Sequence, residues 1–204
     1  MFDTTVRDLP PPRQSAQHPF TLTPFAEPRI EPEIVFRLAA APSPDMDEAA
    51  LFGCMDWVAQ GFEIVQSVFP GWKFAPADTV IVNGLHGALL LAPRHPAGFG
   101  STSDWVSNLA GFEIELVGDG VVVDRGYAAN VFDGPLSALR HLVDLLARDP
   151  VNFAARNRRH RHHRHLDPRL SDLCPAKAGV RRFTASSSAA GLFGSRELDV
   201  AKAA

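Results

Sequence analysis

The sequence predicts an α+β domain, rich in strands and with few helices, whose sheets are mostly antiparallel or mixed. Segments such as residues 29–38 and 112–117 alternate apolar and polar side chains, which is typical of strands. Helical periodicity is confined to residues 45–60 and 135–148. Long strand–helix–strand repeats, which would indicate a parallel sheet, are missing. The 204 residues suffice for one domain with a sizeable core.

The first part of the chain is expected to run from a disordered leader into a strand and then a helix. Residues 1–19 lack periodicity and contain three consecutive prolines, which disfavour regular structure. A strand is expected over residues 29–38. A helix over residues 45–60 is expected next, with acidic residues in its first turn and Gly61 as its end.

The second part of the chain is expected to form a series of strands and one further helix. A Gly-rich turn at residues 118–120, between two apolar segments, predicts a hairpin. Pro135 begins an amphipathic pattern with an aliphatic stripe, which predicts the helix. The expected strands are residues 62–65, 79–82, 88–91, 112–117 and 121–124, and the expected helix is residues 135–148.

Two glutamates on one expected strand, with a third glutamate on another, form the most informative pattern in the chain. Because side chains alternate along a strand, Glu31 and Glu33 share one face and lie roughly 6–7 Å apart along it. Glu63 has aromatic and aliphatic neighbours, among which a bare carboxylate is costly to bury. Clustered carboxylate oxygens are the usual ligands of a hard divalent cation such as Mg²⁺ or Mn²⁺. The alternative is a solvated edge strand, which Pro32 favours.

The composition predicts a cytoplasmic protein without a membrane anchor. The N-terminus shows no signal-peptide pattern, and no apolar segment approaches membrane-spanning length. Cys54 and Cys174 match neither a disulfide framework nor a zinc motif, so a reducing compartment is expected. The charge is uneven, because residues 1–150 have 9 basic and 19 acidic side chains whereas residues 151–204 have 11 and 4.

Four motifs appear in the order that they have in one known family. They are Arg29-Ile30-Glu31-Pro32-Glu33-Ile34, Glu63-Ile64-Val65-Gln66-Ser67, Trp72-Lys73-Phe74 followed by Asp78-Thr79-Val80 and Asn83, and Asn130 followed by Gly134-Pro135-Leu136-Ser137-Ala138-Leu139. On these motifs, residues 20–155 resemble the catalytic domain of the fumarylacetoacetate hydrolase superfamily. Within it they are similar to the branch of 2-keto-4-pentenoate hydratase and 4-oxalocrotonate decarboxylase.

The resemblance implies a β-rich, mixed-sheet roll like the C-terminal domain of that superfamily. It also implies that Glu31, Glu33 and Glu63 bind Mg²⁺ or Mn²⁺, with no other cofactor. A 2-oxo or 2-enol acid would chelate this cation, which stabilises charge on the enolate oxygen. Lys73 matches the family's Trp-Lys motif and is expected to bind substrate carboxylate or to move a proton, unless it is a surface lysine. His86, in a Gly-rich loop, is a second catalytic candidate, with a structural or solvated histidine as the alternative.

The activity implied by the resemblance is that of a metal-dependent hydratase, a lyase that acts on 2-hydroxypenta-2,4-dienoate-type acids in aromatic-compound catabolism. A homo-oligomer with a small-molecule substrate is expected, without nucleic-acid or membrane partners. Decarboxylation or C–C hydrolysis of a related 2-oxo acid is the alternative activity. A truncated, non-catalytic remnant is a further alternative, because few residues precede Glu31 and because Val68 and Val82 replace charged residues of the family.

Residues 156–204 do not resemble the family and are expected to form a basic, disordered tail. The family's closing Thr-Gly-Thr strand is expected where the chain reads Arg158-Arg159-His160-Arg161-His162-His163-Arg164-His165. If His and Arg are encoded there as CAC and CGG, a shift of one base yields Thr-Gly-Thr-Thr-Gly-Thr. An insertion or deletion between the codons for about Asp149 and Arg159 would explain both the lost motif and the reversal of charge. A His-rich metal-binding tail and an Arg-rich nucleic-acid patch are the alternatives.

Overall fold

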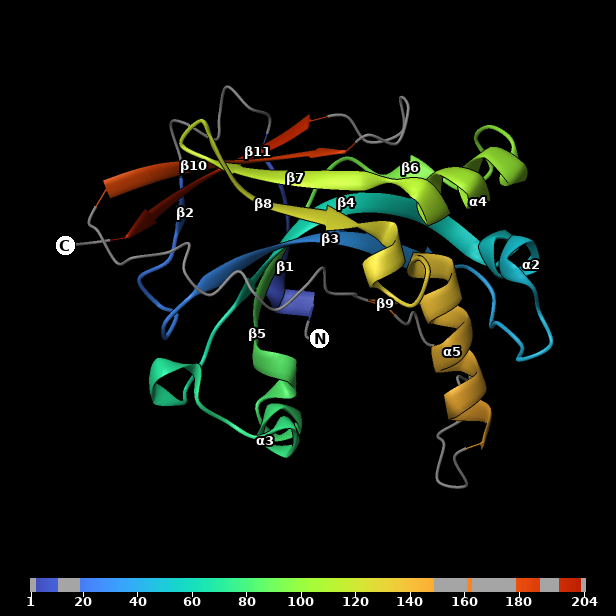
Figure 1. Cartoon of the computed structure of the whole chain (residues 1–204), viewed down its shortest axis with the longest axis horizontal. Coiled ribbons are helices and arrows are strands. Elements are labelled where there is room, and N and C mark those ends of the chain that lie inside the picture. Colours follow the sequence, from blue (N-terminus) through green and yellow to red (C-terminus); the bar gives the residue numbers. More distant parts are fainter. Residues whose placement is uncertain (1–2, 11–18, 149–160, 163–178, 188–194, 203–204) are drawn as a thin grey trace.

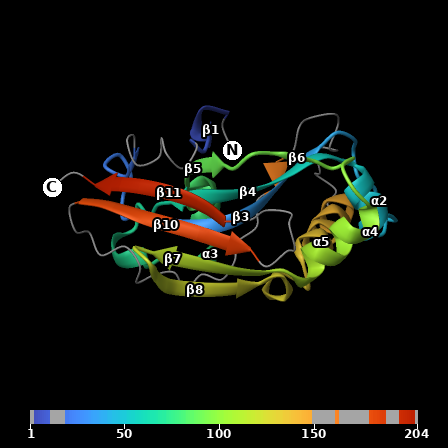
Figure 2. The same cartoon turned by 90° about the horizontal axis from the view of Figure 1, so that it is seen from above.

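Two β-sheets and a group of helices at one end make up the fold. The computed structural model describes residues 3–10, 19–148, 161–162, 179–187 and 195–202. Figure 1 and Figure 2 show the helix group beside one end of the sheets: α2 (Glu48–Gly53), α4 (Thr102–Gly111) and α5 (Pro135–Arg148). The short helix α3 (Pro76–Ile81) lies apart from them (Figure 1). Single 3-10 turns are η1 (Asp3–Thr5), η2 (Pro70–Trp72), η3 (Asn83–Leu85) and η4 (Ala128–Asn130).

The first sheet has the strand order β1-β5-β4-β3-β9, and β6 pairs with β4 as well. Its long strands β3, β4 and β5 pair antiparallel, whereas β1 pairs in parallel with β5. The register between β3 and β4 places Glu31 directly opposite Glu63. The strands are β1 (Val6–Asp8), β3 (Arg29–Leu38), β4 (Met55–Val65), β5 (His86–Leu91), β6 (His95–Pro96) and β9 (Arg161–His162).

The second sheet has the strand order β2-β11-β10-β7-β8. Strands β7 and β8 form the hairpin that the Gly-rich turn predicts, and β10 and β11 form a second hairpin that pairs with β7. The strands are β2 (Phe20–Thr21), β7 (Glu113–Gly118), β8 (Val121–Tyr127), β10 (Gly179–Ser187) and β11 (Ser195–Lys202). With two mixed sheets and few helices, the predicted α+β class is confirmed.

The two faces of the first sheet bury different groups of side chains. Even-numbered residues such as Ile34 and Phe62 belong to the main core, which also contains Leu116 and Leu198 of the second sheet and Leu139 of α5. Odd-numbered residues of β3 and β4 point to the opposite face, because side chains alternate along a strand. That second face carries all three glutamates of the motif.

The expected helix over residues 45–60 is wrong beyond its first half. Helix α2 begins with Asp47 as its cap and ends at Gly53, and residues 55–65 form β4. Almost every residue of β4 is buried, because it pairs with neighbours on both edges and is covered on both faces. The sequence of such a strand is apolar at nearly every position. The apolar residues Met55 and Val58 therefore also match the spacing of a helix. Gly61 therefore lies inside a strand instead of ending a helix.

The expected strand over residues 79–82 is also wrong, because residues 76–81 form α3. Pro76 occupies the first turn, and the Asp78 carboxylate accepts a hydrogen bond of 2.8 Å from the backbone N–H of Ala75. Val80 and Ile81 favour a strand by propensity, but they are 79% and 82% exposed, and no strand in the described part of the chain pairs with them. Helix α4, for which no element was expected, covers part of the main core.

Both ends of the chain contain more structure than expected. Residues 3–10 were expected in a disordered leader, but β1 extends the sheet along β5, and the backbone N–H of Leu9 donates to the Leu91 carbonyl oxygen at 2.7 Å. Residues 179–187 and 195–202 were expected in a disordered tail, but they form the hairpin of β10 and β11. The proposed frame change between about residues 149 and 159 lies outside the described residues.

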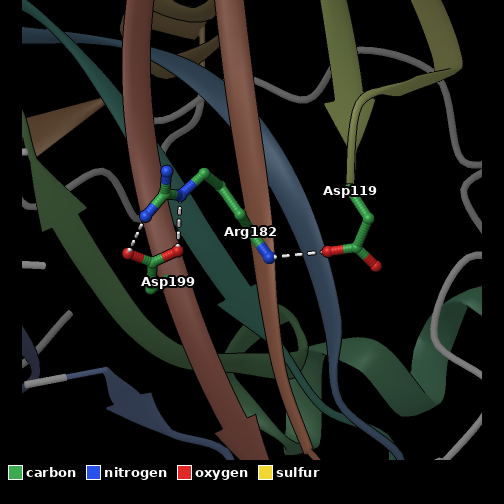
Figure 3. Close-up of polar contacts among 3 residues, drawn as sticks. All are labelled: Asp119, Arg182 and Asp199. Atoms are coloured by element: carbon green, nitrogen blue, oxygen red, sulfur yellow. Dashed lines mark hydrogen bonds and ion pairs between the residues drawn. The ribbon is translucent and has the colours of Figure 1, made fainter. Parts of the chain in front are cut away.

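An ion pair between a half-exposed arginine and a buried aspartate joins β10 and β11. Arg182 and Asp199 are cross-strand partners, and the Arg182 guanidinium donates to both Asp199 oxygens at 2.9 and 3.2 Å (Figure 3). The Asp199 side chain is only 3% exposed, so this bidentate contact compensates a buried charge. The backbone N–H of Arg182 donates to Asp119, in the turn between β7 and β8. Arg182 therefore serves the fold, which the basic composition of this segment did not indicate.

No helix among the described residues is both long enough and apolar enough to span a membrane.

Candidate metal centre

Three glutamate side chains from two neighbouring strands meet on one face of the first sheet. Glu31 and Glu33 are two residues apart on β3, and Glu63 lies on β4 opposite Glu31. One ligand oxygen from each carboxylate lies within 4.8 Å of the others. The three residues are 3%, 1% and 8% exposed, in chain order. The structure thus brings together the three carboxylates that the sequence pattern indicates.

Burial and mutual repulsion oppose the simultaneous ionisation of these carboxylates. The pKa of Glu31 is raised from 4.5 to about 8, chiefly by desolvation and further by the charge of Glu63. The positive charge of Arg29 lowers this pKa, but it is the smallest of the three causes. The Arg29 guanidinium carbon lies 3.6 Å from the centroid of the Trp72 ring. The positive charge of Arg29 therefore only partly offsets the desolvation and repulsion that raise the pKa of Glu31.

The donor set fits a hard divalent cation. Three carboxylates offer only oxygen ligands, which Mg²⁺ and Mn²⁺ prefer. Buried charges of one sign are costly unless a cation compensates them, and a bound divalent ion would supply that compensation. Glu31, Glu33 and Glu63 would hold that ion.

A glycine in β4 permits the close strand packing beside the cluster. Gly61 lies opposite Glu33 on one side and opposite Leu91 on the other. A Cβ atom at this position would lie 2.9 Å from the carbonyl oxygen of Leu90, closer than Cβ atoms normally approach. Because Glu63 is only two residues further along β4, we expect the strand spacing at Gly61 to affect the position of this carboxylate.

His86 lies next to the cluster, and both of its ring nitrogens are in contact with other side chains. Its Nδ1 contacts Oε1 of Glu63, and its Nε2 lies 2.8 Å from Oγ1 of Thr5. The His86 side chain is 5% exposed. The sequence gave no signal for Thr5, because 81 positions separate it from its partner. The structure thus places one of the two expected catalytic residues at the site.

Lys73 is not part of the carboxylate cluster. It directly follows η2 and is exposed. The neighbouring Trp72 packs on Arg29 and donates its indole N–H to the carbonyl oxygen of Glu27 at 3.1 Å. Among the described residues, no hydrogen bond or ion pair joins Lys73 to the glutamates, so its role in binding or proton transfer stays a prediction.

An apolar cluster shares the sheet face of the carboxylates. Val35 follows Glu33 by two positions on β3, so their side chains are neighbours on the same face. Ala59 lies opposite Val35 on β4. The apolar cluster consists of Val35, Trp57, Ala59, Leu89 and Leu91, all of them buried, with Val6 packed against it. The face therefore changes from charged to apolar within two residues of the proposed ligands.

Similar proteins support the assignment of the fold. No family model matches the chain. Over 156 residues the chain is 28% identical to a 2-hydroxyhexa-2,4-dienoate hydratase of Comamonas testosteroni. The aligned region covers 76% of this chain and 54% of that protein. The chain thus spans about half the length of the curated relative that it matches.

Two solved structures resemble the chain along most of its length. The 4-oxalocrotonate decarboxylase from Pseudomonas putida G7, complexed with magnesium and adipate, matches with a TM-score of 0.65 and 17% identity, over 98% of this chain and 67% of that chain. Fumarylpyruvate hydrolase from Pseudomonas aeruginosa, in complex with Mn²⁺ and pyruvate, matches with a TM-score of 0.51 and 13% identity, over 91% and 70%. The chain has the fumarylacetoacetate hydrolase fold. The resemblance that the four motifs predict is therefore confirmed.

In this fumarylacetoacetate hydrolase fold, the raised pKa of Glu31 predicts that stability depends on pH. In the metal-free protein the folded state keeps the Glu31 proton up to about pH 8, whereas the unfolded chain loses it near pH 4.5. The stabilisation that this group contributes is therefore complete below pH 4.5 and is lost as the pH rises through 8.

Thermal unfolding between pH 5 and 9 in EDTA should show this loss, and Glu31→Gln should make the unfolding temperature less dependent on pH. Saturating Mg²⁺ should oppose the loss, because the cation favours the charged carboxylate. A wild-type profile identical to that of Glu31→Gln would contradict the expectation.

Proposed function

We propose that the chain is a metal-dependent hydratase, a lyase that acts on 2-hydroxypenta-2,4-dienoate-type acids in the catabolism of aromatic compounds. The observation that carries the proposal is the buried cluster of Glu31, Glu33 and Glu63 in this fold. The identity to a dienoate hydratase supports the reaction class.

The three glutamates would bind the cation, and the substrate would bind to it through its carboxylate and the adjacent 2-oxygen. A divalent cation there supplies a Lewis acid that stabilises negative charge on this oxygen. Strands β3 and β4 hold the carboxylates in place, because their backbone pairing continues on both sides of Glu31 and Glu63. Lys73 remains the proposed group that binds substrate carboxylate or carries a proton.

Val35 and Leu89 of the apolar cluster are 0% exposed, so this cluster belongs to the packed interior and does not distinguish one substrate from another. The preference for hydration over decarboxylation is supported by the identity to a dienoate hydratase.

We further infer that Mg²⁺ is the working ion and that the enzyme is a cytoplasmic homo-oligomer. The magnesium complex of the similar decarboxylase supports the choice of ion. Sedimentation of the purified chain measures the oligomeric state, and a monomer at all concentrations would contradict this part of the proposal.

Turnover of 2-hydroxypenta-2,4-dienoate with added Mg²⁺ tests the function. We expect loss of the dienoate absorbance and a product that has gained one water molecule, with no activity in EDTA. Release of carbon dioxide from an oxo acid, without water addition, would favour the decarboxylase, and cleavage of a carbon–carbon bond would favour the hydrolase. Absence of both turnover and Mn²⁺ binding would favour the non-catalytic remnant.

A further inference from the structure

Two side-chain contacts join the N-terminal segment, residues 3–9, to the candidate metal centre. Oγ1 of Thr5 lies 2.8 Å from Nε2 of His86, and Nδ1 of the same ring contacts Oε1 of Glu63. The side chains of His86 and Glu63 are 5% and 10% exposed. The contact between His86 and Glu63 is therefore largely shielded from water, which strengthens a hydrogen bond, whereas Thr5 is partly buried.

The chemistry of the three groups sets the direction of both hydrogen bonds. An ionised Glu63 carboxylate can only accept, so Nδ1 of His86 carries the hydrogen and donates it. In the neutral ring, Nε2 then has the free lone pair and accepts from the Thr5 hydroxyl. The Glu63 carboxylate thus sets the ring form, the Thr5 hydroxyl is compatible with it as a donor to Nε2, and His86 holds one oxygen of the carboxylate.

The backbone brings these residues together from three strands or their ends. Residues 6–8 pair in parallel with residues 89–91 of β5, and His86 begins the same strand. Gly87 allows β5 to approach β4 closely, because a Cβ atom there would lie 2.7 Å from the carbonyl oxygen of Ile64. His86 therefore stands between the N-terminal segment and the strand that carries Glu63.

We propose that His86 is a positioning residue that holds the Glu63 carboxylate in place for a divalent cation, and that Thr5 links the N-terminal segment to the same centre. Cation binding then stabilises residues 3–9, although this segment contributes none of the three glutamates. The inference rests on the metal centre of the proposed function. It assigns His86 a role in orienting a ligand, in place of the direct catalytic role that the sequence suggested.

Calorimetry with Mn²⁺ tests the role of His86. We expect His86→Ala to weaken Mn²⁺ binding by about 10- to 100-fold, the range typical for residues that orient metal ligands. His86→Gln should recover part of the loss, because its amide N–H can still donate to Glu63. His141, which is exposed on α5 and packs against Phe132, provides the control His141→Gln, which should bind like the wild type. Equal Mn²⁺ affinity of the wild type and His86→Ala, with both folded by circular dichroism, would overturn the proposal.

Hydrogen exchange of residues 3–9 with and without Mg²⁺ tests the link through Thr5. In the wild type, Mg²⁺ should slow exchange in this segment. Thr5→Val removes the hydroxyl at nearly constant volume, so Mg²⁺ should still bind but should no longer protect residues 3–9. Thr5→Ser should restore the protection, and Thr102→Val, at the exposed start of α4, should leave it unchanged. The link would be overturned if Mg²⁺ left the exchange rate of residues 3–9 unchanged in the wild type. It would also be overturned if Mg²⁺ slowed exchange in Thr5→Val as much as in the wild type.

The two experiments separate this inference from the proposed function. A wild-type chain that fails to bind Mn²⁺ would overturn the metal centre and with it the inference. A wild-type chain that binds Mn²⁺ and hydrates the dienoate, while His86→Ala binds equally well, would overturn the inference alone.

Discussion

Replacing Glu33 by glutamine is expected to abolish turnover and to weaken Mn²⁺ binding by on the order of 100-fold or more, which corresponds to roughly 2.8 kcal/mol. Glu33 is the most buried of the three glutamates, at 1% exposure, and the substitution keeps its shape while removing one of three negative charges. A neutral amide oxygen is a weaker ligand for a hard cation than a carboxylate. Calorimetry with Mn²⁺ and the dienoate assay measure both effects.

The stability of the same variant distinguishes a lost ligand from a damaged fold. Without metal, Glu33→Gln should unfold at a temperature no lower than that of the wild type, because it removes a buried like charge from the cluster. Glu115→Gln, which changes a partly exposed glutamate on β7 that pairs with Arg125, should bind Mn²⁺ normally. Wild-type affinity in Glu33→Gln would mean that this carboxylate is not a ligand.

Replacing Gly61 by alanine is expected to destabilise the fold by about 1–3 kcal/mol, the usual cost of overpacking a core. The added Cβ would lie 2.9 Å from the Leu90 carbonyl oxygen and 3.4 Å from a Leu89 methyl group. Because the closest atom belongs to the backbone, β4 and β5 must move apart. Glu63 and His86 lie on these two strands, so metal binding should weaken as well.

Gly53 provides the matched control for this substitution. It lies in α2, and a Cβ atom there would meet nothing within 4 Å. Gly53→Ala should therefore be neutral or slightly stabilising, since alanine favours the helix and restricts the unfolded chain. Urea unfolding and Mn²⁺ calorimetry of both variants measure the difference. If Gly61→Ala were as stable as Gly53→Ala and bound Mn²⁺ equally well, close packing at Gly61 would not position the site.

The carboxylate cluster could be predicted from sequence because local rules determine most of it. The alternation of β3 places Glu31 and Glu33 on one face whatever the partner strand is. The third member, Glu63, stood out because its neighbours are apolar. Thr5 and the apolar cluster could not be predicted in this way. Their contacts depend on β1 pairing with β5 and on the register of three strands, which no local pattern specifies.

The sequence by itself determined the α+β class, the strand at residues 29–38, the hairpin of β7 and β8, the helix of residues 135–148 and the identity of the three carboxylates. Tertiary structure alone decided that residues 55–60 are a strand, that residues 79–81 are helical and that residues 179–187 and 195–202 contribute two paired strands to the second sheet. The physical reason is the same for both strand regions, whereas residues 79–81 are largely exposed and pair with no strand among the described residues. A strand buried on both faces, or an edge completed by a distant hairpin, gains its stability from partners far along the chain. Helical spacing, β-propensity and net charge report only on neighbouring residues.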